Sequence, residues 1–278
     1  MTVGRWCLLA TLGLGCGGTD GTGEAAAGGD DATTMSAISS ATGGGGQGAG
    51  GSFGGGGAGG EAGTGGGEGG AGGQNPTVPQ PGFGALSGDC GVLEPNALVT
   101  GAPPTTWVNA LDFGSATYDA SLLSPGAQTI IAEGTSGGSS SESEAIAFDV
   151  LFRCELAALL KSETEIGYVP PDSVKTDFLA EIDGMNIGVS VVRAFAFMSD
   201  YTVPIALAAM NDKLGDIQVS SANVVAADAW SKQILAVVAE KPENAAAIQA
   251  ALAMVDPGVR GDTIVVVTVT NGEDAFLY

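Results

Sequence analysis

Among the reactive side chains of this 278-residue sequence, the cysteines are the most informative. There are four of them, at positions 7, 16, 90 and 154. Histidine is absent, which excludes Ser-His-Asp triads, histidine general bases and histidine-rich zinc sites. The chemistry left to consider is therefore that of thiols and of carboxylates.

Cys16 closes a short apolar run and is followed at once by a glycine-rich tract. Residues 6–14 (WCLLATLGL) are too few to span a bilayer and have the length of the apolar part of a signal peptide. The stretch 12–16 (LGLGC) resembles the lipobox of bacterial lipoproteins, although Gly13 stands where leucine is usual. The resemblance implies that residues 1–15 are a signal peptide and that Cys16 is lipidated.

The same resemblance implies a location. A lipidated Cys16 would hold the protein at a membrane in the cell envelope, with lipid as its first partner. Glycine rather than aspartate follows the cysteine, which by analogy favours the outer membrane or the cell surface.

The two remaining cysteines have two alternative fates. Once Cys7 is removed with the signal peptide and Cys16 is acylated, Cys90 and Cys154 are the thiols left. Export exposes them to an oxidising compartment, where a disulfide is expected. The alternative is two separate thiols, with Cys154 facing the core from a helix, because the sequence does not give their Cα separation.

Composition divides the chain into a tether and a domain. Residues 17–88 contain 30 of the 47 glycines and few large apolar side chains, so they cannot bury enough surface to fold. We predict that residues 16–88 are a disordered tether carrying the lipid. Residues 89–278 have enough apolar side chains for a single globular domain, of which residues 89–135 are rich in turns.

Charge limits the partners of this domain. The chain has 9 basic and 31 acidic residues, a formal net charge of −22. Nucleic acids and anionic lipids bind cationic surfaces, so nucleic acid is not expected as a partner. An unidentified protein or small molecule remains as the expected partner, and no cofactor is expected.

Hydrophobic periodicity predicts an α/β domain with a mixed sheet and flanking helices, in the order αβββαβαβ. Ser141 and Glu144 fit a capping box that opens the first helix. Asp183-Gly184 marks a hairpin, and the β-branched run at 263–270 is typical of a buried strand. Helices are expected at 141–161, 204–224 and 243–254, strands at 165–169, 177–182, 185–194, 233–239 and 263–270, and short extended pieces at 106–111 and 128–132.

This order of elements resembles the restriction-endonuclease-like superfamily, over about residues 142–239. That family places an acid on its first helix, an aspartate on a hairpin strand, and an acid and a lysine on the next strand. Carried over, Glu144 and Asp177 match the acids, Val191 replaces the third acid, and Arg193 takes the lysine position. Lys213, on a neighbouring helix, is an alternative source of the lysine.

Two interpretations of function follow. The first is a lipid-anchored extracytoplasmic protein whose domain has a binding or structural role rather than a catalytic one. The second is a metal-dependent nuclease or phosphodiesterase with a degenerate site, in which Glu144 and Asp177 bind Mg²⁺ or Mn²⁺ and Arg193 completes the catalytic set. Val191 cannot ligate a metal, and arginine is too basic to shuttle protons.

Overall fold

The computed structural model describes residues 78–134 and 140–278. The predicted signal peptide, the lipidation site Cys16 and the predicted tether as far as residue 77 lie outside the described residues.

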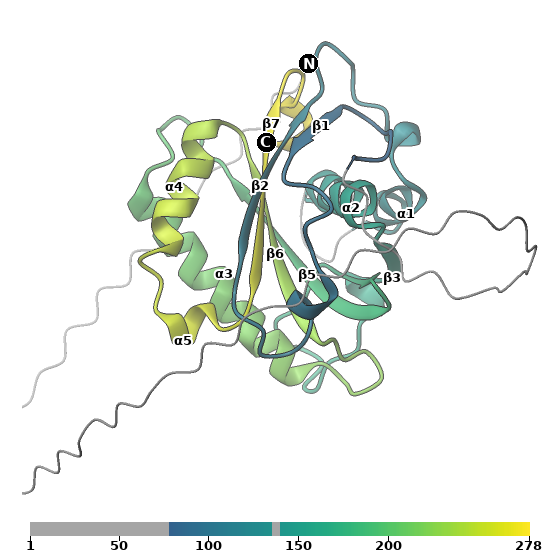
Figure 1. Cartoon of the computed structure of the whole chain (residues 1–278), viewed down its shortest axis with the longest axis vertical. Coiled ribbons are helices and arrows are strands. Elements are labelled where there is room, and N and C mark those ends of the chain that lie inside the picture. Colours follow the sequence, from purple (N-terminus) through teal and green to yellow (C-terminus); the bar gives the residue numbers. More distant parts are fainter. Residues whose placement is uncertain (1–77, 135–139) are drawn as a thin grey trace, which may run out of the picture. The chain divides into compact units, whose positions relative to one another are not determined.

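Within the described residues, seven strands form one mixed sheet. Its order is β1-β2-β7-β6-β5-β4-β3 (Figure 1). The four central strands β2, β7, β6 and β5 run parallel, and the outer strands pair antiparallel. The predicted α/β class with a mixed sheet is confirmed. The strands are Ala85–Gly88 (β1), Thr106–Asp112 (β2), Ala158–Ser162 (β3), Phe178–Ile182 (β4), Met185–Ala194 (β5), Lys232–Ala239 (β6) and Ile264–Asn271 (β7).

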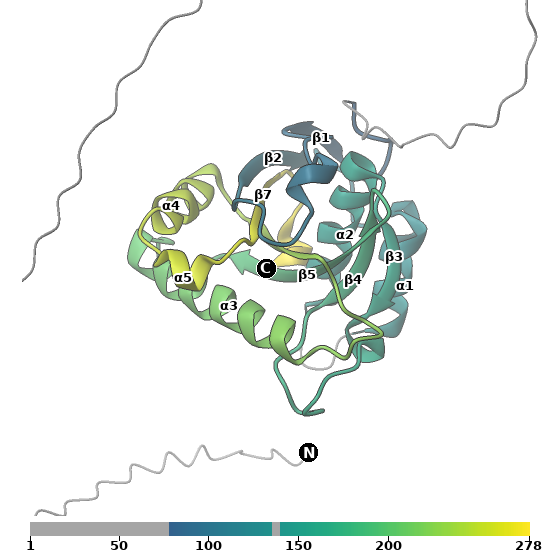
Figure 2. The ribbon, with the colours of Figure 1, turned by 60° about the horizontal axis from the view of Figure 1, so that its bottom comes forward.

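Helices cover both faces of the sheet, as Figures 1 and 2 show. One face carries α1 (Pro125–Glu133) and α2 (Ser141–Glu155), and the other carries α3 (Val203–Asn223), α4 (Pro242–Leu252) and α5 (Pro257–Arg260). Each face has its own hydrophobic core. In the part of the chain that is described, no helix combines the length and apolarity needed to cross a membrane.

Burial on both faces explains the composition of the central strands. All eight residues of β6 are buried, and so are seven of the eight in β7. Parallel strands covered by helices on both faces are expected to be largely apolar, as β6 is after Lys232 and Gln233 and as β7 is from Ile264 to Val267. The predicted strands at 185–194, 233–239 and 263–270 correspond to β5, β6 and β7.

The first helix ends earlier than its periodicity predicts. It was expected to reach residue 161, but α2 ends at Glu155, and Leu156 adopts a left-handed conformation with φ 55°. The chain then turns into β3, whose leucines had suggested helical spacing. No strand forms at 165–169, where a 3-10 turn (Glu163–Glu165) and an isolated bridge at Tyr168 are found instead.

Two further local predictions are wrong. The extended piece expected at 128–132 lies inside α1, which Pro125 opens as the first helical residue. The capping box also fails, because α2 is capped by Ser140 without a side-chain bond. The hydroxyl of Ser141 instead contacts Glu142 at 3.1 Å.

The domain begins before Asp89, so the predicted tether boundary is too late. Phe83 is 2% exposed in the core beside Phe113, and β1 pairs with β2. Phe83 is one of the few large apolar side chains in the predicted tether, and it lies in the stretch that folds. Residues 78–88 therefore belong to the domain. We define its entry segment as residues 78–93, which includes them.

Candidate functional site

The C-terminal turn of α2 holds this entry segment through three consecutive side chains. The first is Arg153, which is 3% exposed. Its guanidinium donates to the carbonyl oxygens of Gln80 at 2.9 Å, Phe83 at 3.0 Å and Gly84 at 2.9 Å. In return, the amide of Gln80 donates to the Arg153 carbonyl. A cation in the last turn of a helix is also favoured by the helix dipole.

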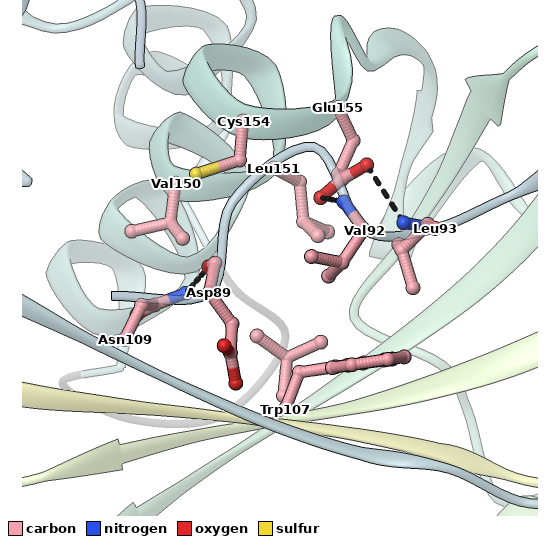
Figure 3. Close-up of a pocket in the computed structure, with 10 residues that line it drawn as sticks. Asp89, Val92, Leu93, Trp107, Asn109, Val150, Leu151, Cys154 and Glu155 are labelled. Atoms are coloured by element: carbon pink, nitrogen blue, oxygen red, sulfur yellow. Dashed lines mark hydrogen bonds between the residues drawn. The ribbon is translucent and has the colours of Figure 1, made fainter. Parts of the chain in front are cut away.

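The next two residues hold the segment further on. Cys154 forms a disulfide with Cys90, which is one of the two alternatives left open by the sequence. Glu155, also buried, accepts hydrogen bonds from three successive amides, those of Gly91, Val92 and Leu93, at 2.9, 3.1 and 3.2 Å. Figure 3 shows the Glu155 carboxylate facing the nitrogens of Val92 and Leu93. We call Arg153, Cys154 and Glu155 the entry clamp.

The entry clamp leaves little room for a ligand. The cavity drawn in Figure 3, which lies between Trp107 and the end of α2, measures about 10 Å³. A cavity of that size holds at most one water molecule. Burial raises the pKa of Glu155, while its three amide bonds act in the opposite direction. The clamp is therefore a structural device.

The two carboxylates predicted as metal ligands, Glu144 and Asp177, interact electrostatically. Asp177 lies just before β4, and its carboxylate accepts a 2.6 Å bond from the amide of Val191 on β5. Burial raises the pKa of Asp177 to about 6, and Lys213 on α3 opposes that rise. Burial also raises the pKa of Glu144 to about 7, and the charge of Asp177 adds to the rise.

The remaining predicted residue does not complete this pair. Arg193 donates to the carbonyl of Leu277 at 2.9 Å, near the C-terminus, and the cation that acts on Asp177 is Lys213. Val191 contributes only its amide to Asp177 and packs its side chain on the core. Within residues 78–134 and 140–278, no group of three or more acidic, cysteine or histidine residues is arranged to hold a metal ion.

The structure also contains a pocket that the sequence analysis missed. It has a volume of about 480 Å³ and lies where β5 and β6 end and α4 begins. The carboxyl ends of parallel strands are where open α/β sheets usually bind ligands. Its lining residues are mostly polar: Ala196, Ser199, Asp200, Tyr201, Glu240, Lys241, Glu243 and Asn244. We call it the carboxyl-edge pocket.

Several groups in this pocket have defined partners. Asn244 donates to the Ala194 carbonyl at 2.8 Å, which ties α4 to the end of β5. Lys241 pairs with Glu240 at 3.3 Å. The hydroxyl of Tyr201, by contrast, is buried and has no hydrogen-bond partner among the described residues. A signal was available in the sequence, because Glu240 and Lys241 directly follow the predicted strand at 233–239.

The fold and these sites define a three-layer α/β domain with a polar pocket at the carboxyl edge of its parallel strands. No family model matches the chain, and no solved structure does. The chain is 37% identical over 164 residues to a Dictyostelium discoideum protein described as "AAC-rich mRNA clone AAC4 protein". The match covers 56% of this chain and 24% of that protein, so the chain spans about a quarter of its relative's length.

Proposed function

We propose that this protein is an exported, lipid-anchored binding protein, held at the cell envelope by Cys16 and a glycine-rich tether. One observation carries the proposal: the disulfide between Cys90 and Cys154. Disulfides persist in oxidising compartments outside the cytosol and are rare within it. The bond supports the interpretation that the N-terminal apolar run exports the chain.

The entry clamp suits a domain that is held through its N-terminal side. A pull on the tether would act first on residue 78 and then on β1, which is short and lies at the edge of the sheet. Cys90 lies two residues after the end of β1, so the covalent bond to α2 would stop such peeling before it reached β2. In this proposal the clamp transmits tension from the tether to the body of the domain.

Cell fractionation tests the proposal. In a bacterial host that processes lipoproteins, the protein is expected in the membrane fraction, extractable by detergent and not by salt. The Cys16→Ser variant is expected in the aqueous fraction, because serine is similar in size but lacks the thiol that would carry the lipid. A Cys7→Ser control should leave the distribution unchanged. Equal membrane binding of the Cys16→Ser variant would contradict the anchor.

A second candidate function, a metal-dependent phosphodiesterase, has one observation in its favour. Asp177 interacts electrostatically with Glu144 and with Lys213, as an acid of such a site would. Val191 still lacks the third carboxylate, and direct charge stabilisation by a metal accounts for several kcal/mol of such catalysis. Each 1.36 kcal/mol corresponds to about a tenfold change in rate, so a weakened metal site would be slow.

We therefore expect no cleavage of DNA, RNA or a small phosphodiester by the full-length protein with Mg²⁺ or Mn²⁺. Cleavage that disappears in Asp177→Asn would instead establish the second function. Binding of Mn²⁺ without turnover, if lost in the same variant, would identify a degenerate site.

A further inference from the structure

We propose that Asn271 is a site of spontaneous deamidation, and that isoaspartate formed there detaches residues 272–278 from the domain. Among the asparagines of the sequence, only Asn271 is followed by glycine. The inference concerns the end of β7 alone and does not depend on the proposed anchor or on a binding role.

The reaction at this pair needs only water as a co-reactant. The backbone nitrogen of Gly272 loses its proton and attacks the side-chain carbonyl carbon of Asn271. A C–N bond forms, and the amino group takes up a proton and leaves as ammonia. Water then opens the five-membered succinimide ring at one of its two carbonyl groups, which gives aspartate or isoaspartate. A side chain on the residue after asparagine hinders the attack, and glycine has none.

The fold requires glycine at position 272. Its φ of 82° lies in the left-handed region, which glycine adopts without strain. A side-chain carbon at this position would also collide with the carbonyl oxygen and the amide nitrogen of Gly114. The contact between the turn after β2 and the turn after β7 therefore places glycine directly after Asn271.

Both reacting groups are accessible. Asn271 is the exposed last residue of β7, and Gly272 is exposed as well. The Gly272 amide donates no backbone hydrogen bond within the described residues. The carbonyl of the same peptide group accepts a 2.9 Å bond from the amide of Phe113, which polarises the group and makes its N–H more acidic.

Isoaspartate would disturb the chain at the point where residues 272–278 begin to pack. It lengthens the main chain by one carbon atom, directly before the bond from the Glu273 amide to the Gly114 carbonyl at 3.0 Å. Further on, Leu277 is 1% exposed in the core, and its carbonyl accepts a 2.9 Å bond from Arg193. A longer connection puts these contacts out of register with β7, so we expect residues 272–278 to detach.

Peptide mass mapping tests the modification in the full-length protein, held in a warm, mildly alkaline buffer. Trypsin cuts after Arg260, and peptide 261–278 contains Asn271 as its only side-chain amide. We expect its mass to rise by the replacement of NH₂ by OH. Peptide 194–213 is the matched control, because its only side-chain amide is the exposed Asn211, which Asp212 follows. This second peptide should keep its mass.

A synthetic peptide 261–278 separates the effect of the fold from that of the sequence. Conversion of the free peptide without conversion of the folded protein would overturn the proposal, because the fold would then protect Asn271. Absence of conversion in both would overturn it too, and so would equal conversion of Asn211 and Asn271.

Chymotrypsin digestion tests the detachment. The deamidated protein, separated by anion exchange through its added negative charge, should be cut at Phe276, where the fresh protein resists. Cutting at Phe197, which is 79% exposed, gives the reference rate in both samples. Asn271→Ser should resist at Phe276 after the same incubation, and Asn211→Ser should behave as the wild type.

Freshly prepared Asn271→Asp carries the added charge on a main chain of ordinary length, so it should resist at Phe276. Cutting of this variant at the rate of the deamidated protein would contradict the role given to isoaspartate. Equal resistance of deamidated and fresh wild type would overturn the detachment.

Discussion

The two ends of α2 treat buried charge in opposite ways. At the C-terminal end, Arg153 and Glu155 are buried, and each binds three backbone groups of the entry segment. At the N-terminal end, Glu144 is 3% exposed and lies near another carboxylate, Asp177. The dipole of the helix favours Arg153 at the C-terminus and Glu144 at the N-terminus, and it disfavours Glu155 at the C-terminus.

The difference teaches which end stabilises the domain. A buried charge stabilises only when hydrogen bonds and opposite charges replace the water that it loses. The C-terminal end has this replacement for Arg153 and Glu155, with Asp149 placed 3.5 Å from the guanidinium. At the N-terminal end, burial and the charge of Asp177 raise the pKa of Glu144 to about 7, and only a hydrogen bond with the Ser140 side chain opposes them. Burial raises the pKa of Glu155 too, but three amide bonds oppose that rise. We expect opposite effects from substitutions at the two ends.

Removing the disulfide should lower the free energy of unfolding more than any other change at the two ends of α2. The bonded cysteines are 64 residues apart in sequence, and closing a loop of this size stabilises a protein by about 4 kcal/mol in the chain-entropy account. The double variant Cys90→Ser, Cys154→Ser should lose about that much free energy of unfolding, measured by urea denaturation. Added reductant should destabilise the wild type and leave the double variant unaffected. A loss below about 1 kcal/mol would mean that Arg153 and Glu155 alone hold the segment.

Arg153 should have the next largest effect. Arg153→Met removes three bonds to backbone carbonyl oxygens, one of them buried and two partly buried, and leaves Asp149 without its cation, so we expect a loss of about 3–4 kcal/mol. Limited proteolysis should then cut between residues 78 and 88, where the wild type resists. Arg153→Lys keeps the charge and loses the planar set of donors. Its free energy of unfolding should therefore lie between those of the wild type and Arg153→Met. Unchanged resistance in Arg153→Met would contradict the role given to this residue.

A substitution at the N-terminal end of α2 should raise the free energy of unfolding, and by less than the losses expected at the C-terminal end. Between the ordinary pKa of glutamate, 4.5, and about 7, the unfolded chain ionises Glu144 before the folded protein does. The stability of the wild type should therefore fall as pH rises through this window and level off above it.

Glu144→Gln removes the contribution of Glu144 to this dependence, and the contribution of Asp177, whose pKa burial raises to about 6, remains. The variant should match the wild type near pH 4 and be more stable at pH 8 by up to about 3 kcal/mol, from the size of the shift. Denaturation series at both pH values measure the difference, with the less buried Glu142→Gln as the control. A Glu144→Gln variant that is less stable at pH 8 would show that the ionised carboxylate has a stabilising partner.

The sequence predicts the centre of this domain better than its edges. β6 and β7 are predictable because burial on both faces forces long apolar runs, and β5 is predictable because Asp183-Gly184 marks the hairpin turn before it. β3 is not, because Leu159 and Leu160 continue the helical spacing of α2, and only the left-handed Leu156 breaks it.

The candidate sites also differ in how far the sequence predicts them. Glu144 and Asp177, predicted as a pair, interact electrostatically, but Arg193, predicted beside them, bonds Leu277. The entry clamp was not predictable as a unit. Arg153 and Glu155 bind backbone groups more than 60 residues away, and backbone groups leave no signature in the side-chain pattern.

The central claim is that the protein is exported, anchored through Cys16 and closed by a disulfide. The intact mass of the protein extracted from membranes, measured with and without alkylation after reduction, tests all three parts together. We predict a mature chain that begins at Cys16, carries the mass of a lipid, and accepts alkylation at Cys90 and Cys154 only after reduction. A chain that starts elsewhere without lipid, with both thiols alkylated before reduction, would contradict the account.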